Sequence, residues 1–180
     1  STAFFGYYVT KVKMSYTFTN AIPTDNPKYQ AYQNFVKTYG VDGNTVMVGI
    51  ETDQLFTPET FNAFVKMTEA YASIPSVTSV LSVDKSVMVV PDSATKIGVA
   101  PVFPKPVDGV YTAAVLDSMK NQFFQLPFYK GLIYNSETNA YLLALNLDKE
   151  IMKTPARKQV MEDIIKIGDS FGSATNIDMH

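Results

Sequence analysis

The stretch from Val46 to Val83, VMVGIETDQLFTPETFNAFVKMTEAYASIPSVTSVLSV, decides the fold of this chain. It opens with a nearly continuous apolar run, Val46 to Ile50, which is typical of a strand covered on both faces. Thr57-Pro58 then supplies a favoured N-cap followed by a proline at the first helical position. A second apolar run, Val77 to Val83, predicts another strand. Residues 46–83 are therefore predicted to form a strand-helix-strand unit.

The C-terminal half, residues 110–180, predicts a helix, a hairpin and a second helix. The first helix runs from about Tyr111 to Phe124, and the hairpin pairs Leu132–Tyr134 with Tyr141–Leu147. Thr154-Pro155 repeats the cap-plus-proline signal, and the helix that follows carries one apolar stripe: Val160, Ile164, Ile167 and Phe171. A further strand is expected after Gly172.

The order of these elements predicts an α+β fold close to a ferredoxin-like split βαβ sandwich. Its helices, which bear Phe64 and Ile164, should pack on one sheet face, with Val46 to Ile50 as a central strand. Residues 84–109 interrupt this order, because four prolines and two glycines break every apolar stretch. They predict a Pro-rich insertion, an irregular connection with at most short strands around Met88 and Val102. Such a long connection is typical of a functional segment or a boundary.

The N-terminal segment predicts contact with a membrane. Residues 1–10 are rich in aromatic side chains and carry no charge before Lys11, yet they are too short to span a bilayer, which takes about 20 apolar residues. We interpret them as the remnant of a membrane helix, preceding a domain of residues 11–180. Residues 11–18 predict a strand, and Asn26-Pro27 opens a predicted helix.

Composition excludes several classes of function. The chain has 180 residues, a net charge of −2 and no cysteine, so a nucleic-acid partner lacks electrostatic support and disulfides or cysteine chemistry are excluded. The single histidine is His180, and no Gly-x-Ser-x-Gly elbow or phosphate-binding glycine loop occurs. Glu51 and Asp53 share one face of a strand but are expected at a solvated rim. We therefore predict that the chain is not an enzyme and holds no metal or cofactor.

One aromatic cluster is the candidate site: Phe123, Phe124, Phe128 and Tyr129. Core packing is the ordinary fate of such rings. The functional alternative is the apolar wall of a substrate cleft or of a contact with a neighbouring domain.

Several segments resemble the first large extracytoplasmic loop of exporters of the resistance-nodulation-division (RND) superfamily, in the hydrophobe-exporter branch related to the mycobacterial (MMPL-like) lipid exporters. The segments that carry the resemblance are Ser15–Phe18, Ile22–Tyr29, the Gly43-Asn44 turn, Ile50–Phe56, Ile74–Val83 and Leu126–Asn135. They are structural segments and none is a catalytic signature. The proton-relay carboxylates of the family lie in membrane helices, so no functional residue carries over.

The resemblance implies a porter domain on the periplasmic side of the inner membrane, within a proton-driven efflux transporter. Its partners would be the second porter loop and the membrane helices of the same polypeptide, together with a hydrophobic or amphiphilic small molecule or lipid; an oligomer of the intact protein is allowed. The alternative is a periplasmic lipid-binding or scaffold module without a transport role. Separated from its neighbours, the loop should expose an apolar patch that includes the four aromatic residues, beside an unpaired strand edge near the C-terminus, and should self-associate weakly.

Overall fold

The computed structural model describes residues 44–93 and 96–180. Within them the chain is α+β, as predicted, with antiparallel sheets and four α-helices. In order, the elements are β1 (Thr45–Glu51), α3 (Pro58–Ser73), β2 (Val77–Leu81), β3 (Val87–Ser93), β4 (Lys96–Pro101), α4 (Ala113–Phe124), the 3-10 turn η2 (Pro127–Tyr129), β5 (Tyr134–Asn135), β6 (Ala140–Leu147), α5 (Lys149–Met152) and α6 (Arg157–Thr175). The predicted membrane-helix remnant 1–10, strand 11–18 and helix from Asn26-Pro27 lie outside the described residues.

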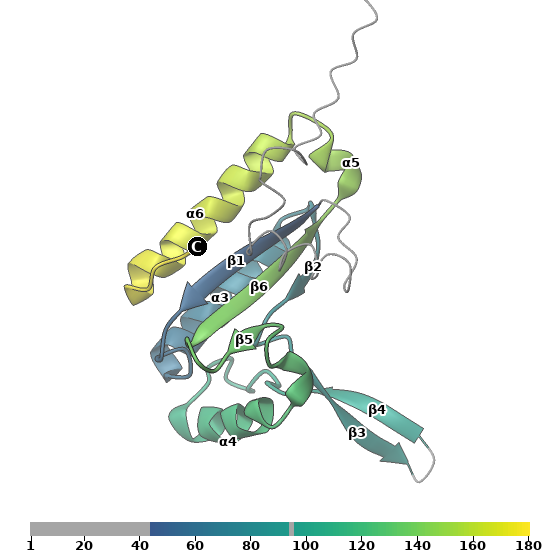
Figure 1. The fold of residues 1–180 in the computed structure, drawn as a ribbon, viewed down its shortest axis with the longest axis vertical. Helices are drawn as coiled ribbons and strands as arrows, with labels where there is room; N and C mark the ends of the chain where they lie inside the picture. Colours follow the sequence, from purple (N-terminus) through teal and green to yellow (C-terminus); the bar gives the residue numbers. More distant parts are fainter. Residues whose placement is uncertain (1–43, 94–95) are drawn as a thin grey trace, which may run out of the picture. The chain divides into compact units, whose positions relative to one another are not determined.

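The main sheet is built around β6 (Figure 1). β1 pairs antiparallel along its whole length, from Thr45 opposite Asn146 to Glu51 opposite Ala140. β5 pairs with the beginning of β6 and β2 with its end, both antiparallel and on the side away from β1. β6 therefore has paired strands on both sides, and the prediction that Val46–Ile50 forms a strand is confirmed.

The outer side of β1 is occupied by the C-terminal residues. The N–H of Gly49 donates to the carbonyl of His180 at 2.8 Å, and the N–H of His180 donates to the carbonyl of Gly49 at 2.9 Å. Ile50 and Met179 form an antiparallel bridge beside them. The order across the sheet is thus the C-terminal residues, β1, β6 and β2.

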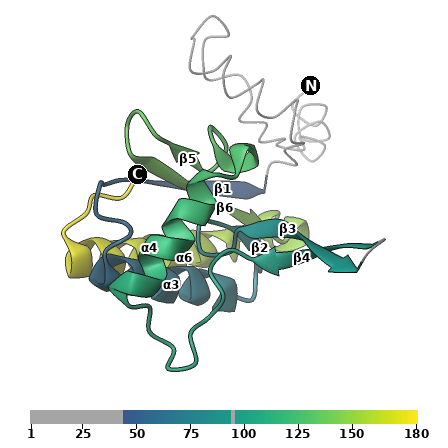
Figure 2. The same cartoon turned by 90° about the horizontal axis from the view of Figure 1, so that it is seen from below.

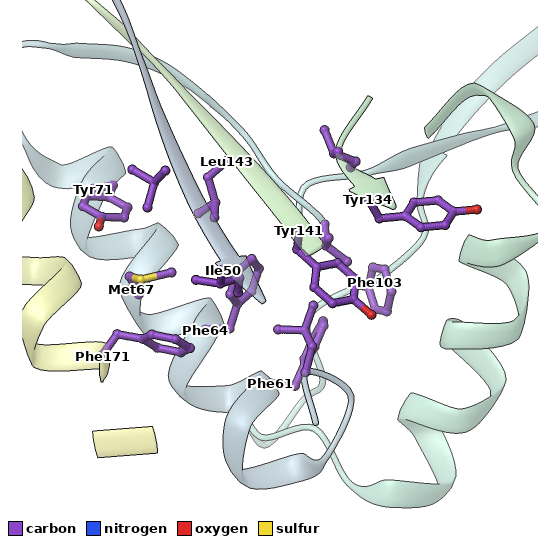
Figure 3. Packing of buried hydrophobic residues seen from close by; sticks show 14 of the residues in the cluster. Ile50, Phe61, Phe64, Met67, Tyr71, Phe103, Tyr134, Tyr141, Leu143 and Phe171 are labelled. Carbon is purple, nitrogen blue, oxygen red and sulfur yellow. The ribbon is translucent and has the colours of Figure 1, made fainter. Parts of the chain in front are cut away.

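Two helices cover one face of this sheet, as predicted (Figure 2). α3 starts where the sequence signals it, because Thr57 Oγ1 accepts from the N–H of Thr60 and Pro58 occupies the first turn. Its buried face is Thr60, Phe61, Phe64, Met67, Thr68 and Tyr71. The buried face of α6 is Val160, Ile164, Gly168 and Phe171. Phe64 and Phe171 meet edge to face, with ring centroids 6.3 Å apart, and join the two helices above the sheet (Figure 3).

The region 84–109 corrects one prediction, because β3 and β4 form an antiparallel hairpin there, with a register shift between Pro91 and Ser93. The N–H of Val102 donates to the carbonyl of Ser86, so the alternation of an antiparallel ladder makes Val87–Pro101 and Pro91–Ile97 pairs without mutual hydrogen bonds. A proline at such a position removes no bond from the ladder. The prolines that suggested an irregular connection are therefore compatible with paired strands.

The second half follows the sequence closely. α4 and the β5–β6 hairpin occur as predicted, and Asn139 at the hairpin turn adopts a positive φ of 51°. α6 begins at Arg157, slightly later than Thr154-Pro155 suggested. The short helix α5, capped by the Asp148 carboxylate, was not predicted.

Candidate functional site

The four aromatic residues of the candidate site lie at the end of α4 and in η2, and the structure separates them by environment. Phe123 and Tyr129 are buried, and Phe124 is half-buried. Phe128 alone is open to solvent, with 70% of its surface exposed. The expected patch of four exposed rings does not form, since two of the four rings are in the core.

Phe123 is a structural residue at the centre of an aromatic cluster. Its ring centroid lies within 5.1–6.3 Å of five others: Phe56, Phe103, Phe124, Tyr129 and Tyr134. Figure 3 shows Phe61, Phe103 and Tyr141 in the same core, with rings supplied by separate segments of the chain. The core-packing interpretation is thus the right one for Phe123.

Tyr129 joins this cluster to the hairpin. Its hydroxyl accepts from the N–H of Val87 at 2.8 Å and donates to the carbonyl of Val87 at 2.9 Å. Phe128 packs edge to face on Tyr129, with centroids 5.2 Å apart. The exposed ring of Phe128 is therefore held next to the residue that anchors the hairpin root.

The hairpin itself carries the most prominent apolar surface of the described residues. Figures 1 and 2 show β3 and β4 projecting away from the sheet and helices. Val89, Ile97 and Val99 are 71%, 81% and 72% exposed, and Val87 is 46% exposed. With Pro91 and Pro101 these residues share one face of the ribbon, because they form the pairs Val87–Pro101, Val89–Val99 and Pro91–Ile97.

Sequence reasoning missed this surface, although a signal was present. The two segments VMVVP (87–91) and IGVAP (97–101) contain no charged or polar side chain and are separated by five residues, DSATK. Two apolar runs around a short polar turn are typical of a hairpin. The prolines outweighed that signal in the prediction.

A groove runs beside the hairpin root. It has a volume of about 400 Å³ and lies between one side of α4 and the residues at the hairpin root. Its lining residues are Met88, Pro101, Val102, Pro104, Ala114, Val115, Ser118, Met119 and Gln122, and none of them is charged. The groove therefore extends the apolar surface of the hairpin onto α4.

A larger groove lies between α3 and α6. Its volume is about 730 Å³, which is within the range of small-molecule sites. Met67, Ile74, Ile167 and Phe171 contribute its apolar part, and small residues such as Ala70 leave room between the helices. Glu59, Lys66, Asp163 and Lys166 also line it, so the lining suits an amphiphilic ligand with an apolar part.

The titratable side chains described next take part in packing and hydrogen bonding within the fold. Burial raises the pKa of Tyr71 and of Tyr141 to about 12 in each case. The hydrogen bond from Lys105 lowers the pKa of Glu69. The buried carboxylate of Asp84 accepts from Thr68 Oγ1 at 2.8 Å and from Ser82 Oγ at 2.5 Å. These bonds fix the turn before β3.

The structure also bears on the predicted acidic rim, on metal sites and on membrane-spanning helices. Glu51 and Asp53 are exposed, as expected of a solvated rim. No three His, Cys, Asp or Glu side chains come together as a potential metal site in residues 44–93 and 96–180. None of the helices in that same part of the chain combines the length and apolarity that crossing a membrane requires.

The comparison with known proteins adds no relative. No family model matches the chain, and a search of curated proteins found no match.

Proposed function

We propose that the chain is an extracytoplasmic porter domain of a proton-driven RND-type exporter, with a ferredoxin-like split βαβ arrangement. In this role it forms part of the conduit through which hydrophobic or amphiphilic substrates leave the membrane. In this role the domain catalyses no reaction. It provides apolar surfaces that contact the substrate and move with the rest of the transporter.

The observation that carries the proposal is the strand order. β1-α3-β2 is one strand-helix-strand unit, and β6-α6 is followed by Met179 and His180, which add a β-bridge to β1 in the place of a further strand. The two units interleave in one antiparallel sheet, in the order C-terminal residues, β1, β6, β2, with both helices on one face. This interleaving supports the split βαβ arrangement that we propose, which the sequence resemblance implies for a porter domain.

The apolar surfaces support a conduit role. Phe128 and the hairpin face are exposed, and Phe128 packs on Tyr129, whose hydroxyl binds Val87 at the hairpin root. Large exposed apolar patches mark sites of interaction with proteins, membranes or ligands. A porter domain needs such surfaces to contact amphiphiles and neighbouring porter loops.

Thiol labelling in whole cells tests whether the domain lies on the periplasmic side of the inner membrane. The chain has no cysteine, so Lys158→Cys on exposed α6 introduces one thiol into this domain of the intact protein. A membrane-impermeant maleimide applied outside the inner membrane should label it, relative to the unsubstituted protein. Labelling only after the inner membrane is opened would overturn the proposal.

Transport is tested in inside-out vesicles that contain the intact protein, with a hydrophobic dye as substrate. Dye movement should depend on the proton gradient and should fall several-fold for Phe128→Ser. The matched control is Ile165→Ser, which removes an exposed apolar side chain from α6 and should leave transport unchanged. Gradient-independent dye movement contradicts the exporter assignment.

The α3–α6 groove favours a second candidate, a periplasmic lipid-binding module. A fluorescent fatty acid titrated into the chain should then bind with one-to-one stoichiometry, and Ala70→Phe should fill the groove and abolish binding. Binding to the chain without gradient-driven transport by the intact protein would select this alternative over the exporter.

A further inference from the structure

The groove between α3 and α6 combines a buried apolar lining with charged side chains. Met67, Ile74 and Phe171 are buried residues that line it. Small side chains on α3, Ala63 and Ala70 among them, leave the space of about 730 Å³ between the helices. A hollow of this volume with an apolar lining is of the size that takes a small-molecule ligand. The apolar part of a ligand therefore has a place between α3 and α6.

The groove is narrow, because the two helices touch along it. Phe64 of α3 packs on Phe171 of α6 (Figure 3). Tyr71, further along α3, reaches Gly168, which comes earlier in α6, so the helices run antiparallel. A further α-helix, about 10–12 Å in diameter with its side chains, can only lie on top of two helices in contact. A single acyl chain is thin enough to lie between them.

Two lysines line the groove from opposite helices, Lys66 on α3 and Lys166 on α6. In the antiparallel alignment they lie within about one helical turn of each other along the groove. No ion pair or hydrogen bond engages either ammonium group within residues 44–93 and 96–180. Two cations without a partner, held on facing walls, favour an anion between them.

The two acidic residues of the lining lie nearer the ends of the groove. Glu59 is in the first turn of α3, roughly 10 Å of helix before Lys66. Asp163 precedes Lys166 on α6 and comes opposite the last turn of α3, and its Oδ1 already accepts from Gln159 Nε2 at 2.9 Å. The middle of the groove is therefore its basic part.

We propose that the groove binds an amphiphile with one acyl chain and an anionic head group, whose head lies between Lys66 and Lys166 and whose chain follows the apolar lining. The inference rests on the amphiphile-binding role of the proposed function, and it names the head group which that role selects. Lysine stems cover apolar surface while their ammonium groups stay in water, so the head group remains at the solvent surface. A carboxylate and a phosphate both meet this requirement.

The first test compares head groups on the same twelve-carbon chain by calorimetric titration. The probes are laurate, dodecyl phosphate, dodecyl maltoside and dodecyltrimethylammonium, each below its critical micelle concentration. Laurate, dodecyl phosphate or both should bind one-to-one and at least about tenfold more tightly than the maltoside, and their binding should weaken with added salt. The tighter of the two anions identifies the head group. Equal affinity for anion and maltoside, or no binding of any probe, overturns the proposal.

The second test removes the two charges. Lys66→Gln with Lys166→Gln should weaken binding of the anionic probe at least about tenfold and leave the maltoside unchanged, because glutamine keeps much of the stem without the charge. The matched control, Lys130→Gln with Lys153→Gln, removes two exposed lysines outside the groove and should bind like the parent. Lys66→Glu with Lys166→Glu should shift the preference to dodecyltrimethylammonium. Unchanged affinity in the glutamine variant, or an equal loss in the control, contradicts the proposal.

The third test locates the acyl chain. The chain of this protein has no tryptophan, so Ser170→Trp places a single indole at the groove and Phe128→Trp places one outside it. A fatty acid with a bromine at the end of its chain should quench the fluorescence of Ser170→Trp at the concentrations at which it binds, and that of Phe128→Trp much less. Equal quenching in the two variants contradicts binding in the groove.

A helix of a partner protein is the other occupant that the tests can reveal. Failure of the amphiphiles to bind, together with cross-linking of a photoreactive residue at position 70 of the intact protein to a polypeptide, would replace the proposal by a helix-binding site. The binding tests use the chain without a proton gradient, so failure of the exporter assignment leaves their results unchanged. Conversely, a lack of head-group selectivity leaves the exporter assignment standing.

Discussion

The hydroxyl of Tyr129 holds both backbone polar groups of Val87, accepting from its N–H at 2.8 Å and donating to its carbonyl at 2.9 Å. The two residues are 42 positions apart in the chain. Val87 lies opposite Pro101 in a pair without mutual hydrogen bonds, so these groups point away from β4. One side chain from the aromatic cluster therefore anchors the root of the projecting hairpin.

Tyr129→Phe should loosen the hairpin while keeping the ring in the cluster. It leaves the N–H and the carbonyl of Val87 without their partner, which costs about 1–3 kcal/mol for groups that water does not fully reach. The free energy of unfolding from urea titration should fall by that amount. Hydrogen exchange should accelerate in β3 and β4 more than in β6.

The control for this prediction is Tyr134→Phe. Tyr134 packs on Phe123 in the same cluster, and its hydroxyl makes no hydrogen bond within the described residues. The control should change stability little. If both variants lose equal stability, the hydroxyl of Tyr129 is not the anchor.

Asn62 should prove important for the placement of the segment before α4. Its side-chain amide donates to the carbonyl of Tyr111 at 2.9 Å, and its Oδ1 accepts from the N–H of Tyr111 at 2.8 Å. Asn62→Ala leaves both peptide groups unpaired, and we expect a loss of about 1–3 kcal/mol in urea unfolding. Asn62→Asp keeps the acceptor and loses the donor, so its loss should be smaller at low pH, where the carboxyl is protonated and can donate. Equal stability of Asn62→Ala and the parent would contradict this role.

Stability should fall at high pH through the buried tyrosines. The pKa of Tyr71 is raised from 10.0 to about 12, and burial is the main cause. Between these values the unfolded chain releases a proton that the folded chain retains, so ionisation favours unfolding. The free energy of unfolding should be steady below pH 9 and should decrease between pH 10 and 12. Tyr71→Phe should reduce the slope, and an identical slope in that variant would show that other groups cause the decrease.

Gly168 and Tyr71 should be coupled. A Cβ at position 168 would lie 3.2 Å from Tyr71 Oη, so Gly168→Ala meets a tight contact between α6 and α3. Alanine is otherwise favoured over glycine in a helix by about 1 kcal/mol. We expect Gly168→Ala to be neutral or destabilising in the parent and stabilising in the Tyr71→Phe background, where Oη is absent. A double-mutant cycle of thermal or urea unfolding measures the coupling, and additive effects would contradict it.

The elements that the sequence predicted correctly are those with local causes. Thr57-Pro58 starts α3 because cap and proline act within one turn, and the stripe through Val160, Ile164 and Phe171 sets the buried face of α6. The α+β class follows from such elements. The place of β6 at the centre of the sheet could not be deduced in this way, since it depends on pairing between distant strands.

The candidate site was predicted only in part, for two physical reasons. A run of aromatic residues does not reveal which rings turn inward, and here η2 sends Tyr129 into the core and Phe128 out to solvent. The hairpin was missed because Pro91 and Pro101 break strands in most positions, and their compatibility depends on the register of the pairing. Register is a property of two strands together, so the sequence of either one does not contain it.

The position of β6 between β1 and β2 also determines when the sheet can form during synthesis. Thr45 and its partner Asn146 are 101 residues apart, and β2 too has its partner in β6. At a synthesis rate of about 5–20 residues per second, Asn146 is added roughly 5–20 s after Thr45, so β1 stays unpaired for that time. The β3–β4 hairpin, whose two strands are adjacent in the chain, can pair well before then. The growing polypeptide thus carries an apolar hairpin and two unpaired strands at the same time, and this interval is when it most needs a chaperone.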